Sequence, residues 1–488
     1  MTYDVVVVGG GIGGLTVAAL LSARGVKTCL LDRQSQVGGC IGRVEFSGYD
    51  FEPGMGLYNG FGANEIFTQI FSELETSAPQ TTLIDEDYVV RMVGRAADIQ
   101  LRKDDAELYE TLRQRFPECA DATVEFYKTV KRVNESWENK EREETKRSLL
   151  SKAFRKFRSP SRSDDILATL TSQTVSSVAK NTSPGFQQFI NAQIGAVLQT
   201  TIERCAFVPA CLALNLLRSN NYSIAGGTAT IAESLADSIK SSGGAIRLNS
   251  PVLRLAYNET GDAIGVDLLT GERVLAKLAI VSNLTVWDTY GKLVGLNKTS
   301  AEMKARLANY SNAGSYLVYA AVEDTTVQRL PSQNFIVGGA APNEDENLSA
   351  EFTVNVQPCA PDGKHPATIK SATEVTPWFS FQASEEDLSE WDQRTLEAAW
   401  TRLHQHVPEL GSGIEVIETA NPRTTYNSTR RKLGMVLGVE PTIENWTTRG
   451  SCQTEIPNLF MVGDTVKPTF GISEVAATAL ELADLLTK

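Results

Sequence analysis

The first thirty-two residues alternate between apolar runs and glycine in a pattern that predicts a strand, a turn, a helix and a second strand. Residues 5–8 are four consecutive valines, as expected for a parallel strand that is covered on both faces. A helix is expected from the glycine turn to Gly25, because glycine commonly ends a helix. The apolar residues 28–31 then predict a second strand, which ends at Asp32.

The turn between these elements carries the spacing Gly-x-Gly-x-x-Gly at Gly9, Gly11 and Gly14. The first glycine permits a tight turn, the second lets the backbone approach a pyrophosphate, and the third lets the helix pack on the strand. The positive end of the helix dipole then faces the phosphate. Asp32 can accept hydrogen bonds from both ribose hydroxyls. The order of elements therefore predicts an adenine dinucleotide site.

A second glycine-rich turn follows at residues 33–43, and we expect it to fold back over the same nucleotide. Residues 44–51 alternate like a β-hairpin. Residues 51–57 hold Pro53, Gly54 and Gly56, which let a backbone come close to a flat ligand.

The next 150 residues or so, from about 65 to 215, show mostly helical spacing and predict a cap. Within it, residues 145–162 carry seven Lys or Arg, no acid, and interleaved Leu and Phe. Such a segment can be an amphipathic helix on a membrane surface. The alternative is a solvated helix whose charges pair with the acid-rich residues 135–144.

From residue 222 the pattern returns to the nucleotide domain. Gly226 and Gly227 precede an expected helix through Lys240, and residues 266–269 and 273–281 predict strands of a hairpin. Near the end, an apolar strand runs into Gly463 and Asp464 and is followed by a helix over residues 471–486. The expected domains are a discontinuous nucleotide domain (1–65, 215–295, 420–488), a helical cap (66–214) and a substrate domain (296–419).

Within the substrate domain, a strand is expected at residues 315–322 and a helix at 385–406. Trp378, Phe379 and Phe381 alternate as on a strand; they could line a pocket or pack in a core. His404 and His406, just before Pro408, are interpreted as surface or capping residues.

Length and composition narrow the class of protein. A chain of 488 residues is expected to form two or three domains. Its formal charge of −13 opposes nucleic-acid binding. Seven scattered cysteines without a C-x-x-C spacing predict no disulfide framework and no metal site, and favour a reducing cytoplasm. The chain has no apolar stretch of about twenty residues, so no membrane span is expected. The first strand is expected to begin at Tyr3, so no signal peptide is expected before it.

The chain resembles the flavin-dependent phytoene desaturases and carotene isomerases, relatives of the amine oxidases, over nearly its full length. The resemblance rests on residues 8–14, Asp32, the turn at 38–39, residues 48–54, 226–227, 251–252, 282–283 with 287–289, and 463–464. Residues 281–289 look especially like the prolycopene isomerase branch. The implied fold is α/β: a Rossmann-like FAD-binding domain, with a parallel sheet and a β-meander, interleaved with an α+β substrate domain and a helical cap.

The resemblance also implies the cofactor FAD and its contacts. Val252 would contact the adenine through its backbone, and Asp464 the ribityl chain or pyrophosphate. The full set of implied cofactor-binding residues is Gly9, Gly11, Ile12, Gly13, Gly14, Asp32, Arg33, Gly38, Gly39, Arg43, Val252, Ser282, Gly463, Asp464, Gly471 and Ile472.

Two positions depart from the family pattern. Cys40 stands where family members usually have Arg, and Arg43 follows three positions later; Arg43 could meet the pyrophosphate or only anchor its loop. Glu474 follows a Pro-Thr-Phe-Gly stretch where many members have Pro-Gly-x-Gly. Glu474 is a candidate catalytic residue that could influence the flavin, with helix capping as the alternative.

Three functions remain open at this point. The resemblance implies an FAD-dependent oxidoreductase that desaturates or isomerises a carotenoid-like polyene, a hydrophobic substrate that also favours peripheral membrane contact. The second is an FAD-dependent oxidase of amines or other small molecules. The third is a prenyl-lipid carrier without enzymatic activity on the same fold. The oligomeric state is left open.

Overall fold

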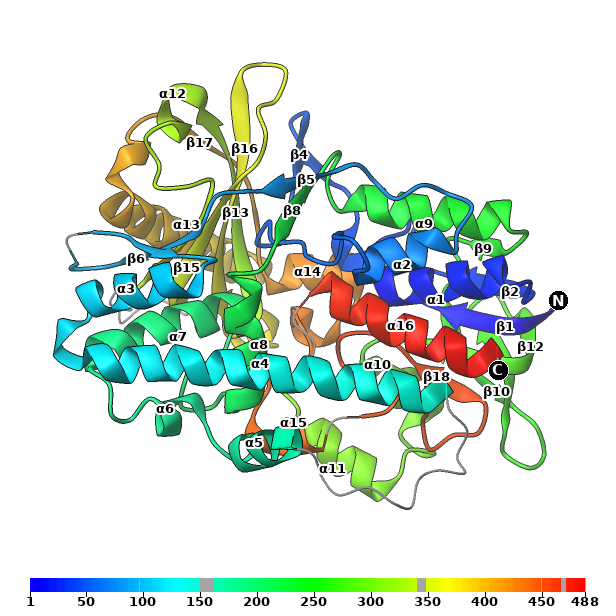
Figure 1. Ribbon diagram of the computed structural model, residues 1–488. Coiled ribbons are helices and arrows are strands. Elements are labelled where there is room, and N and C mark those ends of the chain that lie inside the picture. Colours follow the sequence, from blue (N-terminus) through cyan, green and yellow to red (C-terminus); the bar gives the residue numbers. More distant parts are fainter. Residues whose placement is uncertain (96, 150–161, 340–347, 449, 467–470, 488) are drawn as a thin grey trace.

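Two seven-stranded sheets organise the chain (Figure 1). The computed structural model describes residues 1–95, 97–149, 162–339, 348–448, 450–466 and 471–487. The first sheet lies beside both chain termini, and the second lies at the other end of the molecule, against a group of helices.

The first sheet is parallel at its centre and antiparallel at one edge. β1 pairs in parallel with β2 and β12, and β9 and β18 extend the parallel part on either side. β10, β11 and β12 form an antiparallel meander. This confirms the predicted Rossmann-like sheet. The strands are β1 (Thr2–Val8), β2 (Thr28–Leu31), β9 (Ala245–Arg247), β10 (Val252–Tyr257), β11 (Ala263–Leu268), β12 (Arg273–Ser282) and β18 (Leu459–Met461).

Helices cover both faces of this sheet. Val5 and Val7 of β1 pack against α1 (Ile12–Ala23), α2 (Ile66–Ser72), α9 (Ala229–Ser241) and α16 (Ile472–Thr487). Val6 and Val8 face the opposite side, toward α10 (Val286–Asp288), the π-helix Thr289–Gly295 and α11 (Ala301–Asn309). Burial on both faces explains why residues 5–8 are all apolar instead of alternating.

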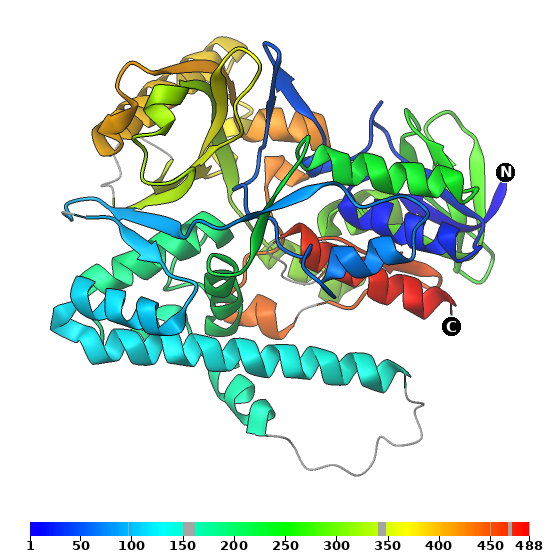
Figure 2. The ribbon, with the colours of Figure 1, turned by 45° about the horizontal axis from the view of Figure 1, so that its top comes forward.

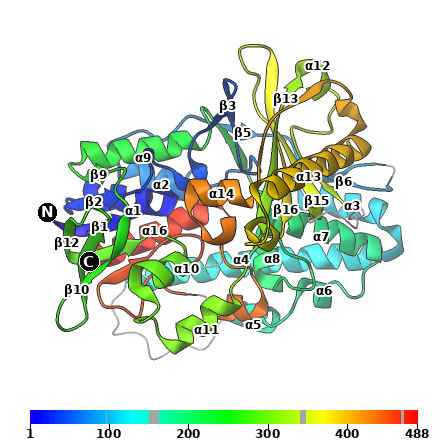
Figure 3. The ribbon, with the colours of Figure 1, turned by 180° about the vertical axis from the view of Figure 1, so that it is seen from behind.

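The second sheet has the strand order β17-β13-β16-β15-β14-β6-β7. Its strands are β6 (Tyr88–Met92), β7 (Ile99–Leu101), β13 (Gly314–Glu323), β14 (Asn334–Gly338), β15 (Leu348–Val356), β16 (Lys364–Thr373) and β17 (Ile414–Ala420). α13 (Glu385–His406) covers one face, which is turned to the viewer in Figure 3. β6 and β7 come from residues 66–214, so that stretch contributes strands to the second sheet as well as helices.

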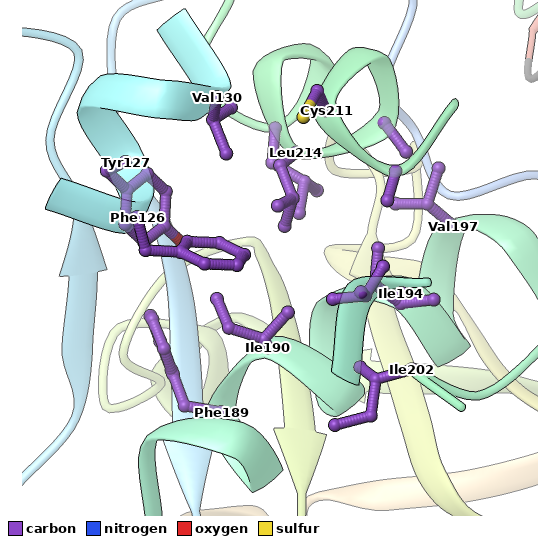
Figure 4. Close-up of a cluster of buried hydrophobic side chains, with 14 of the residues drawn as sticks. Phe126, Tyr127, Val130, Phe189, Ile190, Ile194, Val197, Ile202, Cys211 and Leu214 are labelled. Carbon is purple, nitrogen blue, oxygen red and sulfur yellow. The ribbon is translucent and has the colours of Figure 1, made fainter. Parts of the chain in front are cut away.

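The cap is the group of helices below the second sheet (Figure 2). It contains α3 (Asp105–Arg115), α4 (Ala120–Leu149), α5 (Arg162–Thr171), α6 (Val175–Val178), α7 (Pro184–Leu198) and α8 (Phe207–Leu216). Their buried side chains, including Phe126, Phe189 and Ile190, form one apolar cluster (Figure 4). Each such side chain contributes about 1.5–3 kcal/mol on burial. The same cluster includes Val90 of β6 and Ile336 of β14, so the cap packs directly on the second sheet.

The cap also contains the basic segment. Residues 145–149 end α4, and residues 150–161 lie outside the described part of the chain. The predicted membrane contact at 145–162 is therefore not described by the structure and stays a prediction.

The remaining elements are short. β3 (Val44–Phe46) and β4 (Tyr49–Phe51) form the predicted hairpin, and β5 (Thr81–Ile84) pairs with β8 (Asn221–Ile224). α12 (Asp324–Val327), α14 (Pro422–Thr429) and α15 (Ile443–Thr447) complete the set of α-helices.

The predicted strand around Trp378 is wrong. Thr376–Phe379 is a short 3-10 helix, because Pro377 occupies its first turn and favours helical over ladder geometry. Trp378 stacks on Tyr316 in the core of the second sheet, whereas Phe381 is fully exposed. Core packing, the alternative held open for these aromatics, is what the structure shows for Trp378.

Candidate functional site

The glycine turn lies at the carboxyl end of β1, in the centre of the first sheet. Gly9 has φ +101°, a conformation that favours glycine. A Cβ on Gly14 would lie 2.0 Å from the carbonyl oxygen of Gly9, so the helix can approach the strand only without a side chain there. The first turn of α1 has no acidic side chain, and no side chain caps its start. Its N–H groups are therefore free to meet an anion.

Asp32 and the second glycine turn close around the first turn. The Asp32 carboxylate accepts hydrogen bonds from the N–H of Gly10 (2.6 Å) and of Gln34 (2.7 Å). The N–H of Gly38 donates to the carbonyl of Gly10 (2.8 Å), and a Cβ on Gly39 would lie 3.3 Å from the Cα of Gly11. The fold-back predicted for residues 33–43 is thus present.

Two strand ends from distant parts of the chain meet the same turn. Ser282 of β12 is in register with Val8 of β1 and with Met461 of β18. Asn283, the next residue, places its amide over the turn: a Cβ on Gly11 or on Gly13 would lie 2.7 Å from it. The N–H of Gly463 would be 3.4 Å from a Cβ on Gly13. Asn283 was part of the recognised motif but was missing from the predicted site residues.

Asp464 is held by a residue that the sequence did not reveal. Arg431 donates two hydrogen bonds to the Asp464 carboxylate, at 3.2 and 2.9 Å. Arg431 also bonds the carbonyl oxygens of Met435 and Leu437, and it interacts electrostatically with Cys40. The Asp464 carboxylate raises the pKa of Arg431 against the effect of burial. A guanidinium therefore stands beside Cys40, although it comes from almost 400 residues farther along the chain.

The other two predicted arginines bind protein groups. Arg33 donates to the carbonyls of Asn427 and Ser428 (3.1 Å each), at the end of α14. Arg43 pairs with Asp50 (3.2 Å) and Glu233 (3.8 Å) and lines an exposed crevice of about 220 Å³. These contacts support the loop-anchoring alternative for Arg43.

Ser282 and Val252 support the site from its edges. The Ser282 hydroxyl is fully buried and bonds Thr289 (2.8 Å), so it stabilises the turn after β12. Val252 begins β10, and the neighbouring N–H of Ser250 donates to the carbonyl of Asp32 (2.8 Å). This hydrogen bond connects the start of β10 to the end of β2, where Asp32 lies.

The loop at residues 51–57 is fastened by Glu52. Its buried carboxylate accepts hydrogen bonds from Tyr58 Oη (2.6 Å) and from the Thr228 N–H (2.7 Å) and hydroxyl (3.0 Å). Its carbonyl accepts from Thr368 of β16 (2.8 Å). Glu52 thus joins the end of the hairpin to the start of α9, which packs on the first sheet, and to β16 of the second sheet.

Glu474 lies in the first turn of α16, beside Ser473 and Asn59. Burial raises the pKa of Glu474. Ser473 donates to Glu474 (3.2 Å) and contacts Asn59. Gly471 and Ile472 lead into this turn, and residues 467–470 lie outside the described chain. Ser473 and Glu474 therefore both meet the 52–60 region, at Asn59.

His404 and His406 lie in the last turn of α13, as predicted, and His404 packs on Trp400. In the part of the chain that the structure describes, no group of three His, Cys, Asp or Glu side chains could hold a metal ion. Among the described helices, none is long and apolar enough to cross a membrane.

The sequence model of the family described as "Flavin containing amine oxidoreductase" matches residues 12–472. The chain belongs to this family. It is 25% identical to prolycopene isomerase of Daucus carota, over 99% of this chain and 79% of the carrot protein. It is 20% identical to all-trans-retinol 13,14-reductase of Danio rerio, over 94% of this chain and 82% of that protein. An oxidoreductase from Methanosarcina mazei shares the fold, with a TM-score of 0.65, 17% identity and 99% coverage of both chains.

Membership of the flavin containing amine oxidoreductase family makes this chain a flavin-dependent oxidoreductase. The residues present fit a flavin nucleotide: the glycine turn has no side chains of its own and packs tightly against Asp32 and Asn283, and the uncapped first turn of α1 offers its N–H groups to a phosphate. Gly9 to Gly14, Asp32, Asn283 and Gly463 are the groups that the fold brings together there.

Proposed function

We propose that the protein is an FAD-dependent oxidoreductase acting on a carotenoid-like polyene, by desaturation or by cis-trans isomerisation with reduced flavin. The observation that carries this proposal is the match to prolycopene isomerase over 99% of the chain. The retinol reductase relative, also named for a polyene substrate, supports the same class. Putrescine oxidase shares the fold over all of this chain, but at 14% identity this similarity shows the fold alone.

The chain's own groups have distinct roles in this proposal. The first turn of α1 and the paired glycines would hold the pyrophosphate of FAD, and Asp32 would exchange its bond to the Gly10 N–H for bonds to ribose hydroxyls. Arg431 and Asp464 would position the ribityl chain and pyrophosphate. The bound flavin would supply hydride exchange. The loop fastened by Glu52 would orient the polyene against it and exclude water.

Expression in carotenoid-producing cells, with chromatography of the pigments, tests the proposed function. A changed desaturation level or a changed cis-trans pattern is expected. A matched strain should carry Gly14→Ala, which is expected to leave the pigments unchanged because the turn cannot close. Yellow protein that leaves every pigment unchanged but releases hydrogen peroxide with a soluble amine would favour the amine oxidase. Purified protein without a flavin spectrum would favour the lipid carrier.

A further inference from the structure

The second sheet has an inner face, defined as the face turned toward the loop at 51–57 and toward α7. Side chains alternate between the two faces of a strand. Ala367 and Ile369 of β16 pack with α13 on the outer face. Thr368 bonds the Glu52 carbonyl, and Ser315 of β13 bonds Gln199, at the end of α7. Thr368 and Ser315 therefore mark the inner face.

Lys370 lies in the middle of the inner face. It is two residues beyond Thr368 on β16 and is in register with Leu317 of β13 and Thr353 of β15. Within the described residues it has no hydrogen-bond or ion-pair partner, and burial lowers its pKa to about 8. Glu351, an acid on the same face, is occupied by Asn191 (2.9 Å) and Ser349 (2.6 Å). Lys370 is thus a partly buried cation without a counter-ion in the described chain.

Other polar atoms beside Lys370 also lack partners. Thr353 Oγ1 and Asn355 Nδ2, on β15, are buried and make no hydrogen bond within the described chain. The same is true of Asn334 Oδ1 on β14 and Gln199 Oε1. Leaving such a group unsatisfied costs about 1–3 kcal/mol. Several of them on one face, around one lysine, indicate a place where a ligand completes the bonding.

This polar group borders the loop expected to orient the substrate. A Cβ on Gly56 would lie 2.7 Å from the side-chain oxygens of Asn334 and Asn355. Gly56 has φ +68°, which also favours glycine. The loop backbone therefore rests directly on the asparagines next to Lys370.

A pure hydrocarbon placed against these groups would leave the ammonium and the donors unpaired, which is unfavourable. We propose that Lys370, with Thr353 and Asn355 as further donors, binds the carboxylate end of a polyene acid. This inference rests on the proposed function, since the polyene chain is what the flavin would act on. The carboxylate accepts a charge-assisted hydrogen bond from Lys370, which is stronger than a neutral one. Asn334 and Gln199 can turn their amides to present NH2 groups instead of oxygen.

Binding of two matched probes to the flavin-loaded protein tests this inference. All-trans-retinoic acid and all-trans-retinol differ only in the end group, and quenching of tryptophan fluorescence reports their affinities. The protein should bind the acid at least tenfold more tightly than the alcohol. Lys370→Met should weaken binding of the acid by about 10- to 100-fold, the loss of one hydrogen bond to a charged group, and leave the alcohol unchanged.

Lys364→Met is the matched control, because Lys364 begins the same strand and pairs with Glu415 at the surface (3.1 Å). It should retain the preference for the acid. If Lys370→Met does not fold, Lys370→Gln, which keeps a polar donor, takes its place in the binding measurement. No preference in the native protein, or equal acid binding by both lysine variants, would overturn the inference.

Lys370 could instead contact the flavin. A changed flavin absorption spectrum in Lys370→Met, with acid binding intact, would show this and also overturn the inference. The pigment experiment is independent of the binding experiment. Unchanged pigments with a preserved preference for the acid would count against the proposed function alone, whereas changed pigments without that preference would count against the carboxylate site alone.

Discussion

At the scale of single residues, glycines and one glutamate have the most specific consequences. Gly14 is required because the Gly9 carbonyl lies where its side chain would be. Glu474 is the reverse case, since a carboxyl is present where burial disfavours its charged form. Both effects arise from atoms close to the residue: the Gly9 carbonyl beside Gly14, and the groups that bury Glu474.

Gly14→Ala is expected to abolish flavin binding and to lower the free energy of unfolding by about 1–3 kcal/mol, the usual cost of overpacking. The absorbance of flavin per protein and a urea titration measure these two effects. Gly291→Ala is the control, because a Cβ there meets nothing within 4 Å. If Gly14→Ala kept a full complement of flavin, the close packing would not govern the site.

Glu474→Gln is expected to raise the melting temperature at pH 8 more than at pH 5. The pKa of Glu474 is raised in the folded protein, so its protonated form is favoured by folding. That stability is complete below the ordinary pKa and is lost as pH rises through the folded value. The glutamine variant avoids this loss.

Asp484→Asn serves as the control of opposite sign. Asp484 lies on α16, the same helix as Glu474, and pairs with Arg24 at the end of α1 (3.0 Å). Removing its charge is expected to lower the melting temperature slightly at pH 8, because exposed ion pairs contribute up to about 1 kcal/mol. An equal shift for Glu474→Gln at pH 5 and pH 8 would refute the role assigned to burial.

At the scale of elements, the site depends on connections between strand ends and loops that are far apart in sequence. β18 ends beside the glycine turn, and Arg431 ties Asp464 to the carbonyls that precede β18 by some twenty residues. The Arg431 side chain is 13% exposed and that of Asp464 is 25% exposed. Such a partly enclosed, two-bond pair holds the end of β18 in place.

Arg431→Met is expected to lower the free energy of unfolding by about 2 kcal/mol, the value for hydrogen bonds to charged groups. It should also weaken flavin binding, since the end of β18 would no longer be held. Arg43→Met, at the exposed pair with Asp50, should cost less than about 1 kcal/mol. Equal losses for the two variants would mean that Arg431 has no special place in the site. A urea titration measures the free energy of unfolding of each variant, and flavin absorbance measures its flavin binding.

At the scale of the whole molecule, the proposed polyene substrate is hydrophobic and would be taken up from a membrane. We propose that the basic segment, whose residues 150–161 lie outside the described chain, brings the cap to a membrane surface that holds the substrate. Each Lys or Arg near an anionic surface contributes about 1 kcal/mol.

Replacing Lys152, Arg155, Lys156 and Arg158 by Glu is therefore expected to abolish sedimentation with anionic liposomes. Loss of binding in high salt would be consistent with the same electrostatic cause. Replacing four basic residues elsewhere, Lys240, Lys277, Lys298 and Lys304, controls for net charge. Liposome binding that survives the change in the basic segment would exclude this docking mode.

The sequence by itself determined the local units of this fold. Four valines, the glycine spacing and Asp32 predicted the first strand, turn and helix, and the structure places them as expected, because those backbone conformations depend on neighbours in sequence. The hairpin at Val44–Phe46 and Tyr49–Phe51 and the helix Glu385–His406 were predictable for the same reason. Trp378 was misjudged because alternation alone did not account for Pro377.

Only the tertiary structure decided which distant side chains meet. Arg431 reaches Asp464 and Cys40, and Asn283 lies over Gly11, because parallel strands from three parts of the chain end at one edge of a sheet. Nothing in the local sequence distinguishes Lys370 from other lysines. The strand register places it on the inner face beside Thr353. Register shifts by one residue exchange the two faces of a strand, and no local pattern in this sequence specifies that register.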